Sequence, residues 1–212
     1  MTKGWDRMDQ AQKRRYTLRF IEFMKAEIPG CRIAFKDDPP QTMPWWHRVA
    51  HWAGALVARE YHTRYTTVIH KTIYFPAGTR ETFEKRPQRW YSTLRHEFVH
   101  LKDFDRFHLL MGASYVLLLP TIWTMRSFWE LRGYAQNMMV LNEGTGRVPE
   151  SEVERLAEIF SSRDYGFMLW PRSRARRALA TLRQEVCSGQ LQGPYPYGPL
   201  RTPVPEPIEE EN

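Results

Sequence analysis

The feature that most constrains the fold of this chain is the pentad His96-Glu97-Phe98-Val99-His100, which lies in a segment with helical spacing of apolar residues. Apolar side chains recur there at three- and four-residue intervals, at Trp90, Leu94, Phe98 and Leu101. This spacing predicts a helix from about Gln88 past Leu101. Because positions i and i+4 of a helix stack on one face about 6 Å apart, the two imidazoles can converge on one ion.

A His-Glu-x-x-His pattern on a helix is typical of zinc enzymes that hydrolyse peptide bonds. We predict that His96 and His100 are metal ligands and that the ion is one catalytic Zn2+. Glu97 lies at the edge of the same face, where its carboxylate can take a proton from the attacking water and pass it to a leaving amine. Glu97 is therefore the predicted catalytic residue.

A catalytic zinc needs a third protein ligand, and the residues that follow the pentad do not provide it. The metzincin pattern requires a glycine and then a histidine where this chain has Asp103 and Arg106, so that class is excluded. His108 lies about 12 Å beyond His100 if the helix continues, too far to reach the same ion. The third ligand must therefore come from another element.

Glu130 is the predicted third ligand, because it lies on a second predicted helix, about Ile122 to Leu141, that can return antiparallel past the first. The alternative is a surface carboxylate paired with Arg126 or Arg132. Glu143 is the reserve candidate for the ligand.

The pentad, followed about thirty residues later by Glu130-Leu131-Arg132-Gly133-Tyr134-Ala135, resembles the gluzincin branch of the zincin metallopeptidases, particularly its minimal single-domain members. The resemblance covers about residues 64–136 and departs at Gly133, where similar families often have Ala or Asp. It implies a zinc-dependent peptidase of narrow specificity that acts on a protein or peptide substrate. In such a peptidase Glu130 is the third ligand.

The expected fold class is α+β, a mostly helical zincin-like domain with a small N-terminal antiparallel or mixed sheet. β-branched and aromatic residues predict one strand at 32–35 and another at 64–75, and further helices are expected at 6–26, from Pro149, and at 173–186. The resemblance implies that the strand before the pentad is an edge strand over the cleft, where it could pair with an extended peptide. The stretch 43–60 is not assigned.

The domain organisation follows from length and composition. With 212 residues, of which 42% are hydrophobic and 14% aromatic, the chain is neither disordered nor collagen-like, and residues 1–193 are expected to form one domain before a Pro-rich acidic tail, 194–212. Two cysteines and the absence of a recognisable signal peptide favour a cytoplasmic location. The apolar stretch Leu109–Trp123 is expected to be a buried helical segment, with a membrane-dipping hairpin as the alternative.

Two further hypotheses of function concern binding. The net charge of +7 and a basic segment favour nucleic-acid binding as a second function, through Arg172, Arg174, Arg176, Arg177 and Arg183. A zincin fold with a structural or absent metal, acting as a binding module, is the third. The pair His47 and His51 has Arg48 in place of a base, so it is expected in packing or at the surface. A second group that stabilises the oxyanion is expected, with Tyr165, Tyr134 or His108 as candidates.

Overall fold

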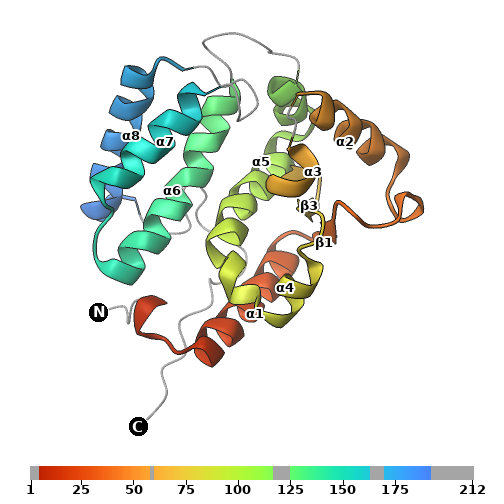
Figure 1. Ribbon diagram of the computed structural model, residues 1–212, viewed down its shortest axis with the longest axis horizontal. Coiled ribbons are helices and arrows are strands. Elements are labelled where there is room, and N and C mark those ends of the chain that lie inside the picture. The colour runs from red at the N-terminus through yellow and green to blue at the C-terminus, as the bar shows by residue number, and fades with distance from the viewer. Residues whose placement is uncertain (1–4, 58–59, 117–124, 163–169, 192–212) are drawn as a thin grey trace.

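The computed structural model describes residues 5–57, 60–116, 125–162 and 170–191, and these ranges are mostly helical (Figure 1). The α-helices are α1 (Gln10–Glu27), α2 (Trp45–Val57), α3 (Tyr61–Arg64), α4 (Arg80–Lys85), α5 (Tyr91–Val116), α6 (Met125–Thr145), α7 (Glu150–Ser161) and α8 (Arg172–Cys187). Short 3-10 helices are η1 (Trp5–Arg7), η2 (Pro40–Thr42) and η3 (Pro87–Trp90). With the small sheet near the N-terminus, the α+β class is confirmed.

The sheet is mixed and has three strands, β1 (Arg32–Phe35), β2 (Thr67–Ile69) and β3 (Thr72–Phe75), in the order β1-β3-β2. β1 pairs with β3 in parallel, and β2 pairs with β3 antiparallel. The prediction of a single strand over 64–75 was wrong, because His70 has a positive φ of 55° and reverses the chain between Ile69 and Thr72. β3 is therefore the central strand, and the edge position expected of it belongs to β2.

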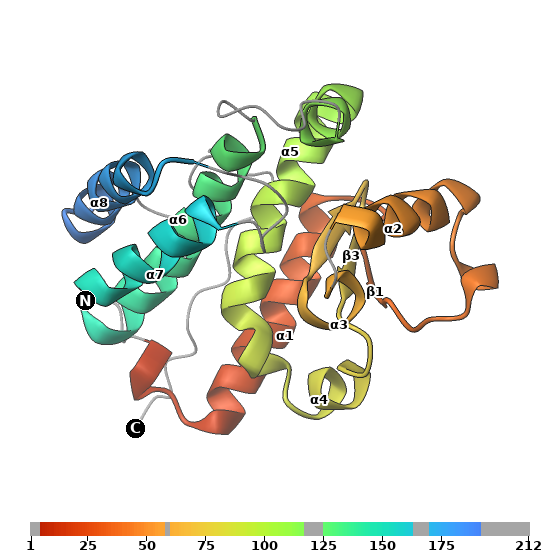
Figure 2. The same ribbon diagram turned by 45° about the horizontal axis from the view of Figure 1, so that its top comes forward.

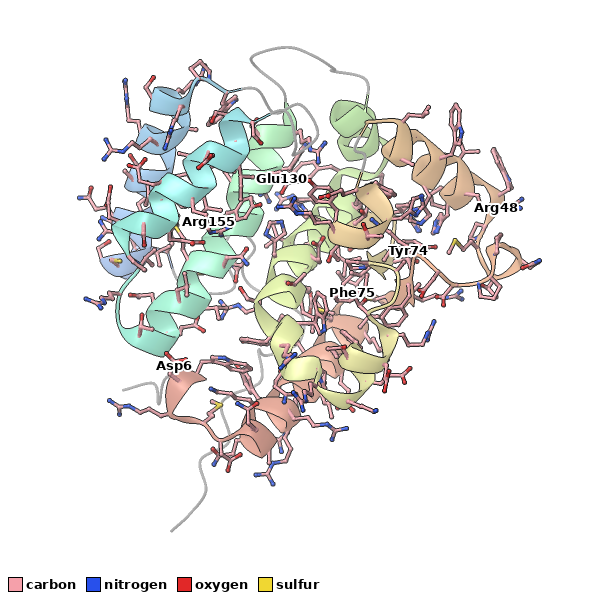
Figure 3. All side chains as sticks on the ribbon, in the orientation of Figure 1. Asp6, Arg48, Tyr74, Phe75, Glu130 and Arg155 are labelled. Atoms are coloured by element: carbon pink, nitrogen blue, oxygen red, sulfur yellow. The ribbon has the colours of Figure 1, made fainter. Side chains whose placement is uncertain are left out.

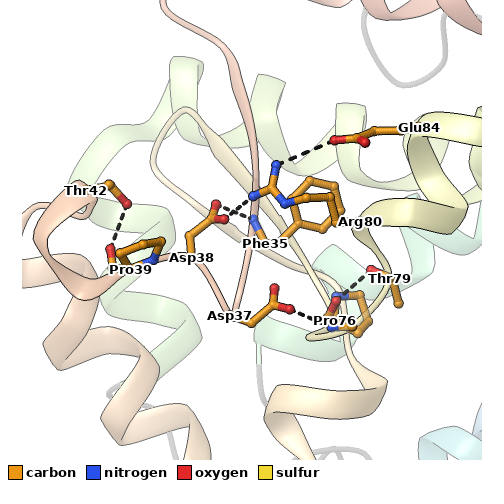
Figure 4. Close-up of polar contacts among 10 residues, drawn as sticks. Phe35, Asp37, Asp38, Pro39, Thr42, Pro76, Thr79, Arg80 and Glu84 are labelled. Atoms are coloured by element: carbon orange, nitrogen blue, oxygen red, sulfur yellow. Dashed lines mark hydrogen bonds and ion pairs between the residues drawn. The ribbon is translucent and has the colours of Figure 1, made fainter.

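Side chains just beyond β1 and β3 fasten these two strands to each other and to α4 (Figure 4). The Asp37 carboxylate accepts a hydrogen bond of 2.9 Å from the backbone N–H of Gly78. Asp38 accepts one of 2.9 Å from the backbone N–H of Phe35 and forms an ion pair with Arg80. These contacts fix the ends of the parallel pair.

One hydrophobic core lies between α1, the sheet and α5. A capping box of Asp9 and Gln12 begins α1 by satisfying free backbone N–H groups of its first turn. From α1 the aromatic side chains of Phe20 and Phe23 meet Phe98 of α5, with ring centroids 5.9 and 5.4 Å away. This core holds the helix that carries the pentad.

A second core lies between α6, α7 and α8, on the opposite side of α5 from the sheet (Figure 2). Phe160 of α7 and Leu179 of α8 are fully buried in it with Met138 of α6. The helix expected after Pro149 is confirmed as α7, with Pro149 as its N-cap residue. α8 confirms the helix expected at 173–186.

The helix α5 is kinked at His108, whose φ of 43° and ψ of −122° are not helical. The backbone of 109–116 is helical beyond the kink, whereas 117–124 and the tail 192–212 lie outside the described residues. Burial of the apolar stretch Leu109–Trp123 therefore stays a prediction. No helix within the described ranges is long and apolar enough to cross a bilayer.

Candidate metal centre

The helices α5 and α6 bring His96, His100 and Glu130 together at their contact. Figure 3 labels Glu130 at this place. The Nε2 atoms of the two histidines are 3.1 Å apart, and Oε2 of Glu130 lies 3.4 Å from Nε2 of His96 and 3.9 Å from Nε2 of His100. All three side chains are buried, and one ligand atom of each falls within 4.8 Å of the others. Two imidazoles and one carboxylate at this spacing form a group that could hold a metal ion.

A hydrogen-bond chain orients His96. Nδ1 of His96 is 2.8 Å from the amide oxygen Oδ1 of Asn137, and the Asn137 amide donates to Oγ of Ser92 over 2.8 Å. Because an amide oxygen only accepts, Nδ1 must carry the proton of the neutral ring. The lone pair of Nε2 then faces Glu130 and His100, as a metal ligand requires.

Asp103 lies behind His100, one turn further along α5. One carboxylate oxygen of Asp103 is 3.9 Å from Nδ1 of His100. The other forms an ion pair with Arg132 of α6, 2.7 Å from its Nη2 atom. Asp103 is fully buried. This acidic side chain supports the far side of the His100 ring electrostatically, while Arg132 neutralises it.

The two carboxylates proposed for the third ligand have different surroundings. Glu130 is buried beside the histidines, Nε of Arg126 lies 3.9 Å from its Oε1, and Arg132 forms an ion pair with Asp103. Glu143, the reserve candidate, forms a 2.5 Å ion pair with Arg95, the residue before His96, and 40% of its side chain is exposed. Geometry therefore favours Glu130.

Gly133 sets the approach of α6 to the site. A Cβ atom at this position would lie 2.5 Å from Nε2 of His96, a distance at which two atoms overlap. The lack of a side chain at Gly133 therefore has a steric reason, because the His96 ring occupies the space that a side chain would need.

Electrostatics couple the three side chains. Burial lowers the pKa of His96, but Glu130, Glu97 and Asn137 outweigh it and raise that pKa to about 9. Burial by itself would raise the pKa of Glu130, yet His96, His100 and Arg126 hold it well below its usual range. Without a metal, a protonated His96 therefore faces an ionised Glu130.

Glu97 lies next to this group on α5 and is also buried. Burial is the main cause that raises its pKa, opposed by the charges of His96, His100 and Lys36. A raised pKa moves a carboxylate toward the range in which it exchanges protons at neutral pH.

Comparisons of the chain with family models, with curated proteins and with solved structures gave no match.

The candidates for a second oxyanion-stabilising group lie in different places. Tyr134 stands edge-on to the His96 ring at 4.9 Å and packs on Phe160 in the second core. His108 is exposed at the kink of α5, and Tyr165 lies outside the described residues. The structure thus gives Tyr134 a packing role.

His47 and His51 lie on the buried side of α2, where each contacts a tyrosine. Nδ1 of His47 is 2.6 Å from the hydroxyl of Tyr74, and Nδ1 of His51 is 2.9 Å from the hydroxyl of Tyr61. Neither histidine belongs to the metal-binding group found in the described residues. The packing expected for this pair is confirmed.

Sequence reasoning missed Asn137, Ser92 and the structural use of Asp103. A signal existed for Asn137, because it follows Glu130 by seven residues, two helical turns, and so lies on the same face of α6. Ser92 lies four residues before His96 and shares its face of α5 in the same way. The pairing of these faces depends on how α5 and α6 dock.

Proposed function

We propose that the chain is a zinc-dependent peptidase in which His96, His100 and Glu130 hold one Zn2+. The observation that carries the proposal is the buried convergence of both pentad histidines on a carboxylate from the neighbouring helix. Three protein ligands of this kind leave a coordination position open, as in catalytic zinc sites. The neighbouring Glu97 supplies the proton-transfer group that such a site needs.

The residues have separate tasks in hydrolysis. The bound Zn2+ supplies Lewis acidity to a peptide carbonyl and to water. Glu97 takes the proton of the attacking water and then gives it to the leaving amine, and its raised pKa suits both transfers. Asn137 keeps the proton of His96 on Nδ1 and its lone pair directed into the site.

The substrate of this proposal is a protein or peptide in extended form. β2 is an edge strand of the sheet and contacts α5, the helix that carries the site. An edge strand offers backbone groups to which an extended peptide can pair. In the β2–β3 pair the backbone groups of Thr67 and Ile69 face Tyr74 and Thr72, so the outward-facing N–H of β2 is that of Val68. Val68→Pro removes this N–H, so we expect a higher KM with unchanged zinc content; an unchanged KM in a folded variant would remove this part of the proposal.

The test of the function uses Glu97→Gln with Glu143→Gln as the matched control. We expect the wild-type chain to bind one equivalent of zinc and to cleave members of a peptide library. Glu97→Gln should keep the zinc but lose activity by about a hundredfold or more, because it cannot transfer the proton, whereas Glu143→Gln should keep both. Normal turnover by Glu97→Gln would contradict the assignment.

Metal analysis separates the peptidase from a binding module. His96→Ala and Glu130→Ala should each lose the equivalent of zinc found in the wild type, measured by elemental analysis. A wild-type chain that takes up no added zinc would contradict the peptidase and favour the module with an absent metal. A chain that binds zinc but cleaves nothing in the library would favour a structural ion.

Nucleic-acid binding through α8 stays the second hypothesis. Three of its five arginines, Arg172, Arg176 and Arg183, form ion pairs with Glu150 or Glu154 of α7, at 3.7 Å for Arg172–Glu154 and 3.3 Å for Arg183–Glu150. Phosphate groups would have to compete with these carboxylates. Salt-dependent retardation of DNA that is lost when Arg174, Arg176 and Arg177 become Glu would support the hypothesis.

A further inference from the structure

The helix α2 exposes a large apolar face. Five of the seven large hydrophobic side chains that are exposed in the described ranges belong to this helix. Their exposed fractions are 69% for Trp45, 40% for Trp46, 53% for Val49, 65% for Trp52 and 68% for Leu56. We call these five residues the α2 face.

The spacing of these residues makes the face continuous. Trp45, Val49, Trp52 and Leu56 follow one another by four, three and four residues, so they line one side of the helix. At 1.5 Å per residue the row is about 16 Å long. Trp46 widens it at the N-terminal end. A contiguous apolar surface of this kind marks an interaction site rather than scattered exposure.

The opposite side of α2 is polar and buried, which reverses the usual arrangement of a surface helix. His47 and His51 are 3% and 5% exposed, and each is hydrogen-bonded to a tyrosine hydroxyl. Gly54 lets the Tyr61 ring lie where a Cβ atom would be 2.6 Å from it. These contacts hold α2 with its histidines inward, so its tryptophans are fixed toward the outside.

The only charged residue within α2 is basic, Arg48. From Pro39 to Arg59 the chain contains two arginines, Arg48 and Arg59, and neither Asp nor Glu, and the net charge of the whole chain is +7. Arg48 is exposed at the outer edge of α2 (Figure 3). A helix that exposes apolar and basic side chains side by side binds anionic lipid, because the headgroups attract the cations and the acyl region accepts the apolar rings.

The position and composition of α2 favour a lipid surface over a protein groove. The helix lies at the outer edge of the molecule, away from α6, α7 and α8, in both orientations of the ribbon (Figures 1 and 2). Three of its five exposed apolar residues are tryptophans, the side chains enriched at the interface between a membrane and water. We infer that the α2 face docks on an anionic lipid membrane, with the helix axis parallel to the surface and the tryptophan rings at the level of the headgroups.

The test is binding of the full-length chain to vesicles, measured by co-sedimentation. We expect binding to phosphatidylcholine vesicles that contain phosphatidylglycerol, with weaker binding to phosphatidylcholine alone and weakening by salt. The double variant Trp45→Glu/Trp52→Glu should bind at least about tenfold more weakly, because two charges replace apolar rings that would be buried in the interface. Leu18→Glu, which changes an exposed apolar side chain of α1, is the matched control and should bind as the wild type does.

A second readout places the helix. Brominated lipids should quench the tryptophan fluorescence of the wild type, and the quenching should fall in Trp45→Phe/Trp52→Phe, which keeps the face apolar and the fold intact. Equal vesicle binding by the double Glu variant and the wild type would overturn the inference, as would no binding to anionic vesicles at low salt. Self-association without lipid, abolished by Trp45→Glu/Trp52→Glu, would also overturn it, because the occupant would then be a second copy.

Discussion

Gly133 lies so close to His96 that an added Cβ atom would overlap the ring of this proposed metal ligand. Gly133→Ala places a Cβ atom against the His96 ring, so either α6 moves outward or the ring turns away. We expect zinc affinity to fall by about a hundredfold, since the loss of ligand geometry removes one of three protein ligands. Competition with a chromogenic chelator measures the change.

Gly144→Ala is the control, because it makes the same substitution eleven residues later in α6. The nearest atoms to its Cβ belong to the flexible side chain of Asp6, at 3.1 Å. Zinc affinity should be unchanged in this variant. If Gly133→Ala binds zinc as tightly as Gly144→Ala does, the close approach of α6 to His96 is not what the site requires.

Asn137 orients His96, one of the proposed zinc ligands. Asn137→Ala leaves Nδ1 of His96 without its acceptor, so we expect a tenfold to hundredfold loss of zinc affinity, the range typical of residues that orient a metal ligand. Ser92→Ala removes only the hydroxyl that holds the Asn137 amide and should cost less. A larger effect of Ser92→Ala, measured by the same chelator competition, would contradict this order.

At the site, residue type and spacing were sufficient to predict His96, His100, Glu97 and Glu130 as candidates. The pentad places two ligands on one helix face by itself, and a second helix with an acidic residue supplies a third. The roles of Gly133 and Asp103 could not be predicted. Each depends on the distance and rotation between α5 and α6, which result from side-chain packing across the whole contact.

The buried histidines of α2 make the stability of the folded chain depend on pH. Burial and the nearby His70 lower the pKa of His47 to about 4; burial, Lys36, His62 and His47 lower the pKa of His51 to about 4. In the unfolded chain both titrate near 6.5. Between pH 6.5 and 4 the unfolded state therefore binds more protons, so stability is full above pH 6.5 and falls as the pH falls.

We expect the free energy of unfolding to drop with a slope of up to about 1.4 kcal/mol per pH unit for each of these histidines. Urea unfolding at several pH values between 7 and 4, with a chelator present throughout, measures the slope. The variant His47→Gln/His51→Gln should have a shallower slope than the wild type. Equal slopes would show that these two side chains do not titrate with unfolding.

The long helices could be predicted from sequence, while α2 and the turn between β2 and β3 could not. In α1 and α7 the apolar side chains face the core, so their periodicity indicates the buried side directly. In α2 the apolar side faces outward and the histidines face inward, so hydrophobic periodicity would predict the exposed side to be the buried one. At 67–75 every residue suits a strand, and the reversal depends on His70 adopting a positive φ.

The molecule as a whole has two cores whose contact contains the proposed metal ligands. His96 and His100 belong to α5, which packs in the first core, and Glu130 belongs to α6, most of which packs in the second. Zinc at about a hundred times its Kd should therefore add about 2.7 kcal/mol to the stability of the docked state. Hydrogen exchange should show greater protection in both α5 and α6.

His96→Ala provides the control for this effect, because it should show no gain in protection on adding zinc. Thermal unfolding of the wild type should move to higher temperature with zinc and return with a chelator. Protection gained in α5 alone would contradict bridging by Glu130. The same result would leave the two histidines as the ligands and require a different third group.

The arrangement of α2 also has a consequence for the order in which the chain acquires its shape during synthesis. The ribosome completes α2 before it adds Tyr61 and Tyr74, whose hydroxyls bond to His51 and His47. Until those tyrosines emerge, His51 and His47 lack the hydroxyl partners that hold them inward in the folded chain. The nascent chain therefore presents its tryptophans early, and residues translated later decide which way they point.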